Sequence, residues 1–145
     1  MEYFNTINDF DRITGFTDGI KTMEHKELTE VIIGCAYRVY NTMGFGYLES
    51  VYEKCMIIEL RKAGLTVETQ KAINVFYHAE LVGEFIADMV INDTIIIELK
   101  SVKHLSQAHE VQLVNYLVAT GKPLGLLINF GESKVDVKRK HKDRK

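Results

Sequence analysis

The segment IIIELK, residues 95–100, places two charged side chains in what its composition predicts to be a buried strand. An ionised group in such a strand is destabilising unless it is paired or binds a metal. Side chains alternate along a strand, so Glu98 and Lys100 are expected on one face. A turn centred on Asp93 would place Asp88 of the preceding strand directly opposite Glu98, and a two-residue loop would make them diagonal neighbours. The three side chains are therefore expected to project together.

Two carboxylates at such a short separation repel each other unless a cation lies between them. Hard divalent cations such as Mg²⁺, or Mn²⁺ in its place, prefer such oxygen ligands, and the backbone carbonyl of Leu99 could add another. Lys100 would then orient or help to deprotonate a bound water, or stabilise charge on a phosphoryl group. This arrangement is typical of phosphodiester cleavage. The alternative is a plain ion pair between Glu98 and Lys100 at a sheet edge.

Two further segments carry polar residues that could serve the same site. His109, Gln112 and Tyr116 form one stripe of the helix expected after the Glu98 strand. Gln112 and Tyr116 could reach the site or a phosphate, or the stripe could be the polar flank of an amphipathic helix. Glu49 stands at the start of another helix, where it could stabilise the helix dipole or provide a fourth acidic group.

Periodicity predicts the elements that position these residues. The expected helices span 26–42, 48–63 and 106–120, and the expected strands span 67–77, 81–91, 95–100 and 124–130. The order ααβββαβ predicts an α/β fold with a mixed central sheet flanked by helices. The last strand should lie parallel to 95–100 after a right-handed helical crossover.

The length of 145 residues suits one domain. We expect a domain over residues 23–133, a loose N-terminal extension over 1–22 with Met23 as a possible true start, and a basic tail over 134–145. The tail holds seven Lys or Arg and two Asp, so the remaining residues carry a net charge of −7 within a total of −2. The tail is either solvated, or it attracts phosphates through residues such as Lys138, Arg139 and Lys140.

The cysteines and the hydropathy pattern bear on the compartment. Cys35 and Cys55 both lie in apolar helical patterns and indicate core residues of a reducing compartment, not a disulfide framework. No apolar run approaches the roughly 18 residues that span a membrane, and the polar N-terminus is unlike a signal peptide. We expect a soluble cytoplasmic protein.

The stretch GYLESVY, residues 46–52, matches the signature of the GxxExxY proteins. The resemblance continues through ELRKAGL, Asp88, IIIELK, HEVQLVNYL and GLLINFG, and it covers roughly residues 25–131. That family is similar to a branch of the PD-(D/E)xK nuclease superfamily. The resemblance therefore implies a restriction-endonuclease-like core.

The resemblance also implies roles for individual residues. Asp88 resembles the motif aspartate, although Ala87 stands where the motif has proline, and Glu98 and Lys100 resemble the E-x-K pair. Glu49 resembles the acidic residue that many members supply from an early helix.

In the same way, Gln112 and Tyr116 resemble the Q-x-x-x-Y motif of exonuclease branches. Together these matches imply a DNA nuclease dependent on Mg²⁺ or Mn²⁺, with a homodimer or a partner protein as possible sources of specificity. Two other functions stay open: a catalytically silent interaction module with this fold, and hydrolysis of another phosphate ester.

Overall fold

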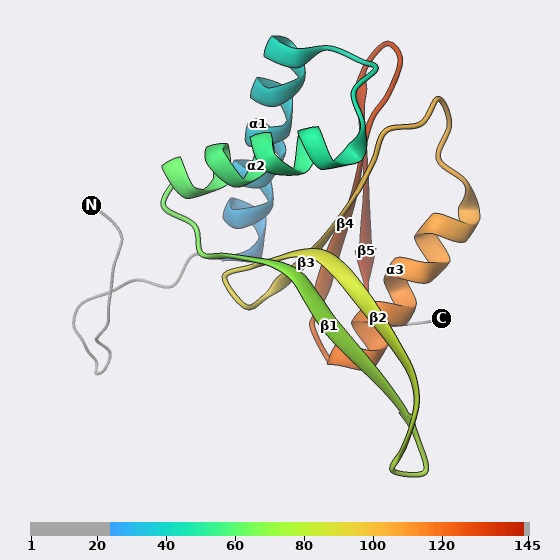
Figure 1. Cartoon of the computed structure of the whole chain (residues 1–145). Coiled ribbons are helices and arrows are strands. Elements are labelled where there is room, and N and C mark those ends of the chain that lie inside the picture. Colours follow the sequence, from blue (N-terminus) through green and yellow to red (C-terminus); the bar gives the residue numbers. More distant parts are fainter. Residues whose placement is uncertain (1–23, 144–145) are drawn as a thin grey trace, which may run out of the picture.

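The computed structural model describes residues 24–143, and Figure 1 shows their arrangement. The helices are α1 (His25–Met43), α2 (Glu49–Lys62) and α3 (Gln107–Thr120). The strands are β1 (Val67–Tyr77), β2 (Glu80–Ile91), β3 (Ile95–Lys100), β4 (Leu124–Phe130) and β5 (Val135–His141). The expected mixed sheet flanked by helices is confirmed, and the order agrees with the predicted one through β4. The predicted extension over 1–22 lies outside the described residues.

The five strands form one sheet in the order β1-β2-β3-β4-β5. All neighbours are antiparallel except β3 and β4, which are parallel as the helical crossover requires. Helices α1 and α2 cover one face and α3 covers the other, so the sheet lies between two apolar clusters. β3 and β4 are buried on both faces, which explains their nearly continuous apolar sequences.

The C-terminal segment differs from the expected tail. Residues 135–141 form β5, which pairs with β4 along its whole length. Val135 and Val137 pack against the cluster beneath α1, while Asp136, Lys138 and Lys140 alternate with them and lie on the α3 face of the sheet. The high density of lysine and arginine concealed this two-residue alternation. Lysine is common on edge strands because it discourages further strand pairing.

A tight turn fixes the register of β2 and β3. Asn92 and Asp93 both have positive φ, at 50° and 54°, and the Thr94 N–H donates to the Ile91 carbonyl at 2.9 Å. This geometry favours a hairpin because it matches the twist of the strands. Pairing of Ile91 with Ile95 is centred on Asp93, as the sequence predicts.

Two smaller findings complete the fold. Cys35 and Cys55 are both free thiols. Within residues 24–143, no helix is long and apolar enough to cross a membrane.

Candidate metal-binding and nuclease site

The regular backbone pairing of β2 with β3 ends at Met89 and Ile97. At the next position, Asp88 and Glu98, side-chain carboxylates accept the hydrogen bonds instead. Glu98 Oε2 accepts a hydrogen bond from the Asp88 backbone N–H at 3.0 Å. Asp88 Oδ2 accepts one from the Leu99 backbone N–H at 2.8 Å. Each carboxylate therefore bonds to the backbone of the other strand, and both are held in the sheet at the same place.

Near Asp88, the side chains of β1 and β2 switch the face of the sheet to which they point. Val67 and Ile73 lie six residues apart and would share a face in a regular strand. Instead Val67 joins the cluster beneath α1 and α2, and Ile73 joins the cluster beneath α3. Gln70 lies between them with a φ of 51°, and the register sets it opposite Asp88. Because the backbone is irregular here, the Asp88 carboxylate reaches the backbone of β3, and regular backbone pairing is interrupted at this position.

The two carboxylates are strongly perturbed. Glu98 is only 7% exposed. This burial, and after it the charge of Asp88, raises the pKa of Glu98 from 4.5 to about 8. Burial also raises the pKa of Asp88, against the hydrogen bond from Leu99. The Lys100 ammonium opposes both shifts by favouring the ionised carboxylates. The pair is therefore held in a place where two negative charges are unfavourable without a cation.

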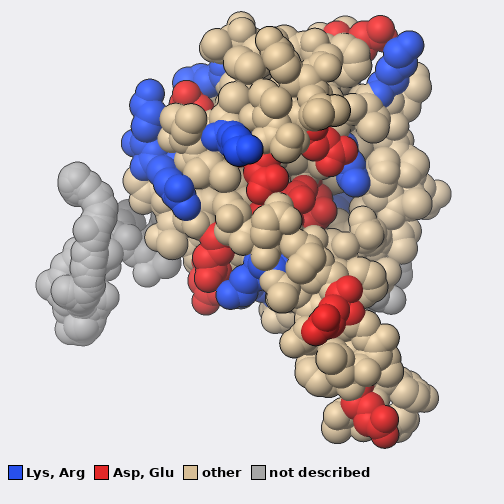
Figure 2. Space-filling model, viewed as in Figure 1, with Lys and Arg blue, Asp and Glu red and all other residues tan. Residues whose placement is uncertain are grey.

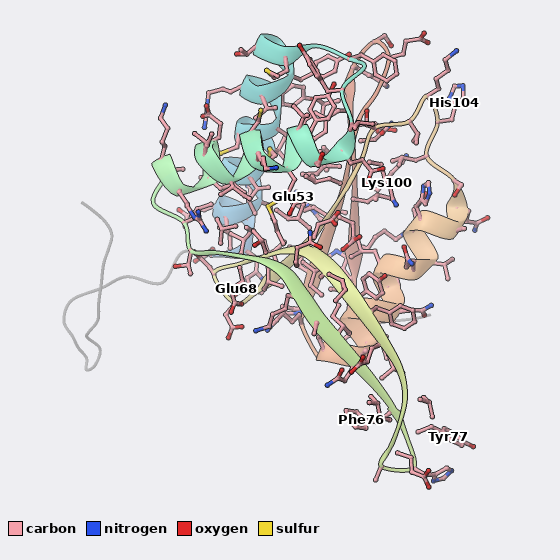
Figure 3. The ribbon with its side chains drawn as sticks, viewed as in Figure 1. Glu53, Glu68, Phe76, Tyr77, Lys100 and His104 are labelled. Carbon is pink, nitrogen blue, oxygen red and sulfur yellow. The ribbon has the colours of Figure 1, made fainter. Side chains whose placement is uncertain are left out.

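Helix α2 directs two more acidic groups toward the pair. The charges of Glu53 and Glu49 both raise the pKa of Asp88, and Glu49 also raises that of Glu98. Glu53 Oε2 accepts a hydrogen bond from Gln70 Nε2 at 3.0 Å. Figure 3 shows Glu53 on the sheet side of α2 and Lys100 at the end of β3, and Figure 2 shows acidic groups gathered near the centre of this face.

Sequence reasoning missed Glu53 and Gln70. Glu53 follows Glu49 by one helical turn, so the i, i+4 spacing could have indicated it. Gln70 has no such signal because its importance comes from the strand irregularity.

The start of α2 is fixed by a tyrosine. Tyr52 is fully buried, stacks on Phe130 with ring centroids 4.4 Å apart, and donates a hydrogen bond to the Gly44 carbonyl. The Tyr47 carbonyl accepts from Ser101 Oγ at 3.0 Å, directly after Lys100. The turn before α2 is thus tied to the end of β3, which brings the first turn of α2 to the carboxylate pair.

The loop after β3 is fixed from β4. The buried Asn129 side chain accepts from the Val102 N–H at 2.9 Å and donates to the Val102 carbonyl at 2.8 Å. This clamp orders the backbone that follows Lys100.

Helix α3 brings Tyr116 to the site. The pKa of Tyr116 is raised by burial and then by the charges of Glu98 and Asp88. Gln112 is exposed and lines an open groove together with Tyr116. His109 has a structural contact, because its Nδ1 accepts from the Ser106 N–H at 3.3 Å and completes a capping box at the start of α3.

The structure does not bring the basic residues of β5 to the carboxylates. Lys138 shares a row and a face with Glu98, but β4 lies between them, a separation of roughly 10 Å at the usual strand spacing. Lys140 pairs with Glu110 of α3 at 3.0 Å. Arg139 lies between Lys138 and Lys140 on the strand and therefore points to the opposite face of the sheet.

The donor set fits a hard divalent cation in its chemistry. Each carboxylate uses one oxygen for a backbone bond, so Asp88 Oδ1 and Glu98 Oε1 are the candidate ligands. The N–H and C=O of one strand residue point to the same neighbour, so the Leu99 carbonyl also faces β2. Within the described part of the chain, no three His, Cys, Asp or Glu side chains are close enough to hold a metal ion together. Glu49 and Glu53 are therefore not placed as direct third ligands.

Comparison with known proteins identifies the family of the chain. A family model described as the PD-(D/E)XK nuclease superfamily matches residues 26–140. The chain belongs to the PD-(D/E)XK nuclease superfamily. The match includes β5 as far as Lys140 and both strands of the carboxylate pair.

Structural comparison shows the same fold in a distant protein. The crystal structure of SSO0001 is similar with a TM-score of 0.54 at 17% sequence identity, and the match covers 83% of this chain. The chain spans 60% of the length of SSO0001, and at this identity the likeness concerns the fold alone. The comparison with curated proteins finds no match.

Proposed function

We propose that this superfamily member is a metal-dependent nuclease that hydrolyses phosphodiester bonds in DNA. The observation that supports this most directly is the pair of crossed hydrogen bonds between Asp88 and Glu98. A buried pair in which the charge of Asp88 raises the pKa of Glu98 is destabilising in a merely structural role, and apolar residues could replace it. Perturbed carboxylates beside a lysine are typical of functional sites. The GxxExxY signature at residues 46–52 is consistent with this assignment.

Asp88 and Glu98 would hold Mg²⁺ or Mn²⁺, with the Leu99 carbonyl as a further ligand and Glu49 acting through a water molecule. When bound, such a cation supplies an acidified water and stabilises charge on a phosphoryl group. Lys100 stands on the same strand face as Glu98 and would orient the attacking water and help to remove its proton. Gln112 and Tyr116, and less directly His109, would contact the scissile phosphate.

The DNA-binding residues are more widely spread than the catalytic ones. Lys138, Arg139 and Lys140 belong to an edge strand, so any contact they make with nucleic acid lies outside the carboxylate site. The chain without residues 134–145 is acidic, which disfavours tight non-specific DNA binding by the core. We propose a cytoplasmic protein, consistent with its two free thiols.

A metal titration combined with cleavage assays tests the proposal. Mn²⁺ should raise the melting temperature of the wild-type chain and give calorimetric heat, and Asp88→Asn should abolish both. Asp93→Asn is a matched control, because Asp93 is 84% exposed and pairs with Lys122 away from the site. Linear, nicked, branched and single-stranded DNA should be assayed beside free nucleotides.

Absence of any Mn²⁺ response in the wild type would contradict the catalytic assignment and favour a silent interaction module. Hydrolysis of nucleotides without cleavage of DNA would instead indicate another phosphate ester as the substrate.

A further inference from the structure

The hairpin of β1 and β2 forms an arm that extends beyond the body of the molecule (Figure 1). We use "the arm" for residues 72–86. Six large apolar side chains on the arm are 43–67% exposed. They are Phe76, Tyr77, Leu81, Val82, Phe85 and Ile86. Phe76 and Tyr77 lie near its free end (Figure 3). Consecutive strand residues point to opposite faces, so these side chains cover both faces of the arm. Scattered apolar residues are normal on a surface, but large apolar side chains on both faces of a projecting hairpin favour an interaction site.

The arm forms one wall of an open groove of about 910 Å³, and the outer face of α3 forms the other. Val111 and Val118 line the groove from α3 and are 53% and 46% exposed. No lysine, arginine, aspartate or glutamate is among the described residues that line it. A helix whose outer face carries valines in place of charges is not built to face water.

Charge decides between a nucleic acid and a protein as the occupant. The groove offers no cation to neutralise phosphates, and the arm carries the exposed carboxylates of Glu80 and Glu84. Figure 2 shows the arm as largely uncharged surface interrupted by acidic groups. Nucleic acid binding depends strongly on phosphate neutralisation. The surface therefore suits an apolar protein face.

The exposed area is sufficient for a stable interface. If a fully exposed aromatic side chain offers roughly 150–250 Å² and an aliphatic one less, the six residues on the two faces of the arm expose, together with Val111 and Val118, roughly 600–800 Å². This approaches the roughly 800 Å² that each partner buries in a standard protein interface.

We propose that a second copy of this chain occupies the groove, with the arm of each copy lying in the groove of the other. A two-fold interface must be self-complementary, which requires a projecting part and a receiving part on one surface. The arm and the groove meet this requirement because the arm is itself a wall of the groove. The interface would also cover the side chains at the arm's free end, such as Tyr77 and Val82, which lie beyond the reach of α3.

The proposed interface borders the carboxylate site. Tyr116 lines the groove and makes a tilted ring contact with Phe85, with ring centroids 5.5 Å apart. The charge of Glu98 also raises the pKa of Tyr116, so this tyrosine lies between the groove and the carboxylates. The arm of the second copy would therefore lie next to Tyr116 and Gln112. If the proposed nuclease function holds, the dimer narrows the entrance to the site from this side.

Sedimentation of the full chain tests the dimer independently of any metal or cleavage. The wild type should sediment at micromolar concentration with twice the 16.6 kDa of one chain. A Phe76→Glu and Val111→Glu double variant should be monomeric, with a dissociation constant raised roughly 100-fold or more. Ile58→Glu is the matched control, because Ile58 is 59% exposed on α2, and it should stay dimeric.

A monomeric wild type at 100-fold higher concentration, roughly 100 μM, would overturn the proposal. So would a dimer that survives the double variant or is lost in Ile58→Glu. A monomeric wild type whose affinity for a single-stranded oligonucleotide falls in the double variant would assign the surface to nucleic acid instead. Should the double variant fail to fold by circular dichroism, hydrogen exchange of wild-type α3 at high and low concentration gives the answer. Protection that does not increase with concentration contradicts the dimer.

Discussion

Glu98 accepts a hydrogen bond from the backbone of Asp88, and Asp88 accepts one from the residue that follows Glu98. These bonds take the place of backbone pairing between β2 and β3. They also hold two carboxylates close together with little water. The pH dependence and the stability of the fold, and the metal binding proposed above, are therefore coupled at one position in the sheet.

The metal-free protein should become less stable as the pH rises from about 4.5 to about 8. The pKa of Glu98 is raised from 4.5 to about 8, so in this window the unfolded chain releases a proton that the folded chain keeps. The contribution of Glu98 to the free energy of unfolding is fully present below pH 4.5, the pKa in the unfolded chain, and is lost as the pH rises through about 8, the pKa in the folded chain. At about 1.4 kcal/mol per pKa unit it amounts to at most roughly 5 kcal/mol.

Chemical denaturation at a series of pH values, with a chelator present, measures this. Glu98→Gln is the matched variant, since its amide oxygen can still accept from the Asp88 N–H but cannot ionise. Its stability should vary less with pH and exceed that of the wild type above pH 8. An equal slope in both proteins would show that another group carries the pH dependence.

Lys100→Met should separate metal binding from cleavage. The lysine is a cation beside two carboxylates, so its removal should leave Mn²⁺ affinity unchanged or slightly higher. Cleavage should fall roughly 10²–10⁴-fold if Lys100 activates the water. Single-turnover cleavage and calorimetry measure the two effects, with Lys103→Met as a control on an exposed lysine of the next loop. Loss of metal binding with unchanged cleavage per bound metal would argue against this role.

Tyr52→Phe tests whether the motif tyrosine is structural. Its hydroxyl bonds to the Gly44 carbonyl in a buried setting, and its ring stacks on Phe130. Removal of the hydroxyl should cost about 1–2 kcal/mol of unfolding free energy and leave Mn²⁺ affinity within a fewfold of wild type. Tyr37→Phe, on an exposed tyrosine of α1, should change neither quantity. A large loss of cleavage without a loss of stability would instead indicate a chemical role for Tyr52.

The sequence predicted those features that depend on local rules. Asn92 and Asp93 accept positive φ, so the turn and the register that brings Asp88 to Glu98 could be predicted. The face change at Gln70 could not, because the apolar pattern of β1 continues across it and only tertiary packing against α2 and α3 reveals it. The strand β5 was hidden by its lysines, since charge density in a terminal segment resembles a solvated tail.

Glu53→Gln should weaken metal binding, although the sequence pattern indicated only Glu49 on this helix. Glu53 is the first of the two helix carboxylates in its effect on Asp88, and Gln70 fixes it in place. Loss of its charge should lower the pKa of Asp88 and reduce Mn²⁺ affinity by roughly tenfold, the factor that corresponds to about 1.4 kcal/mol of lost attraction. Glu30→Gln, on an exposed residue of α1, controls for net charge. Calorimetric titrations at matched pH and ionic strength compare the two variants. If Glu30→Gln weakens binding as much as Glu53→Gln does, the effect belongs to the overall charge of the protein and Glu53 has no special place in the site.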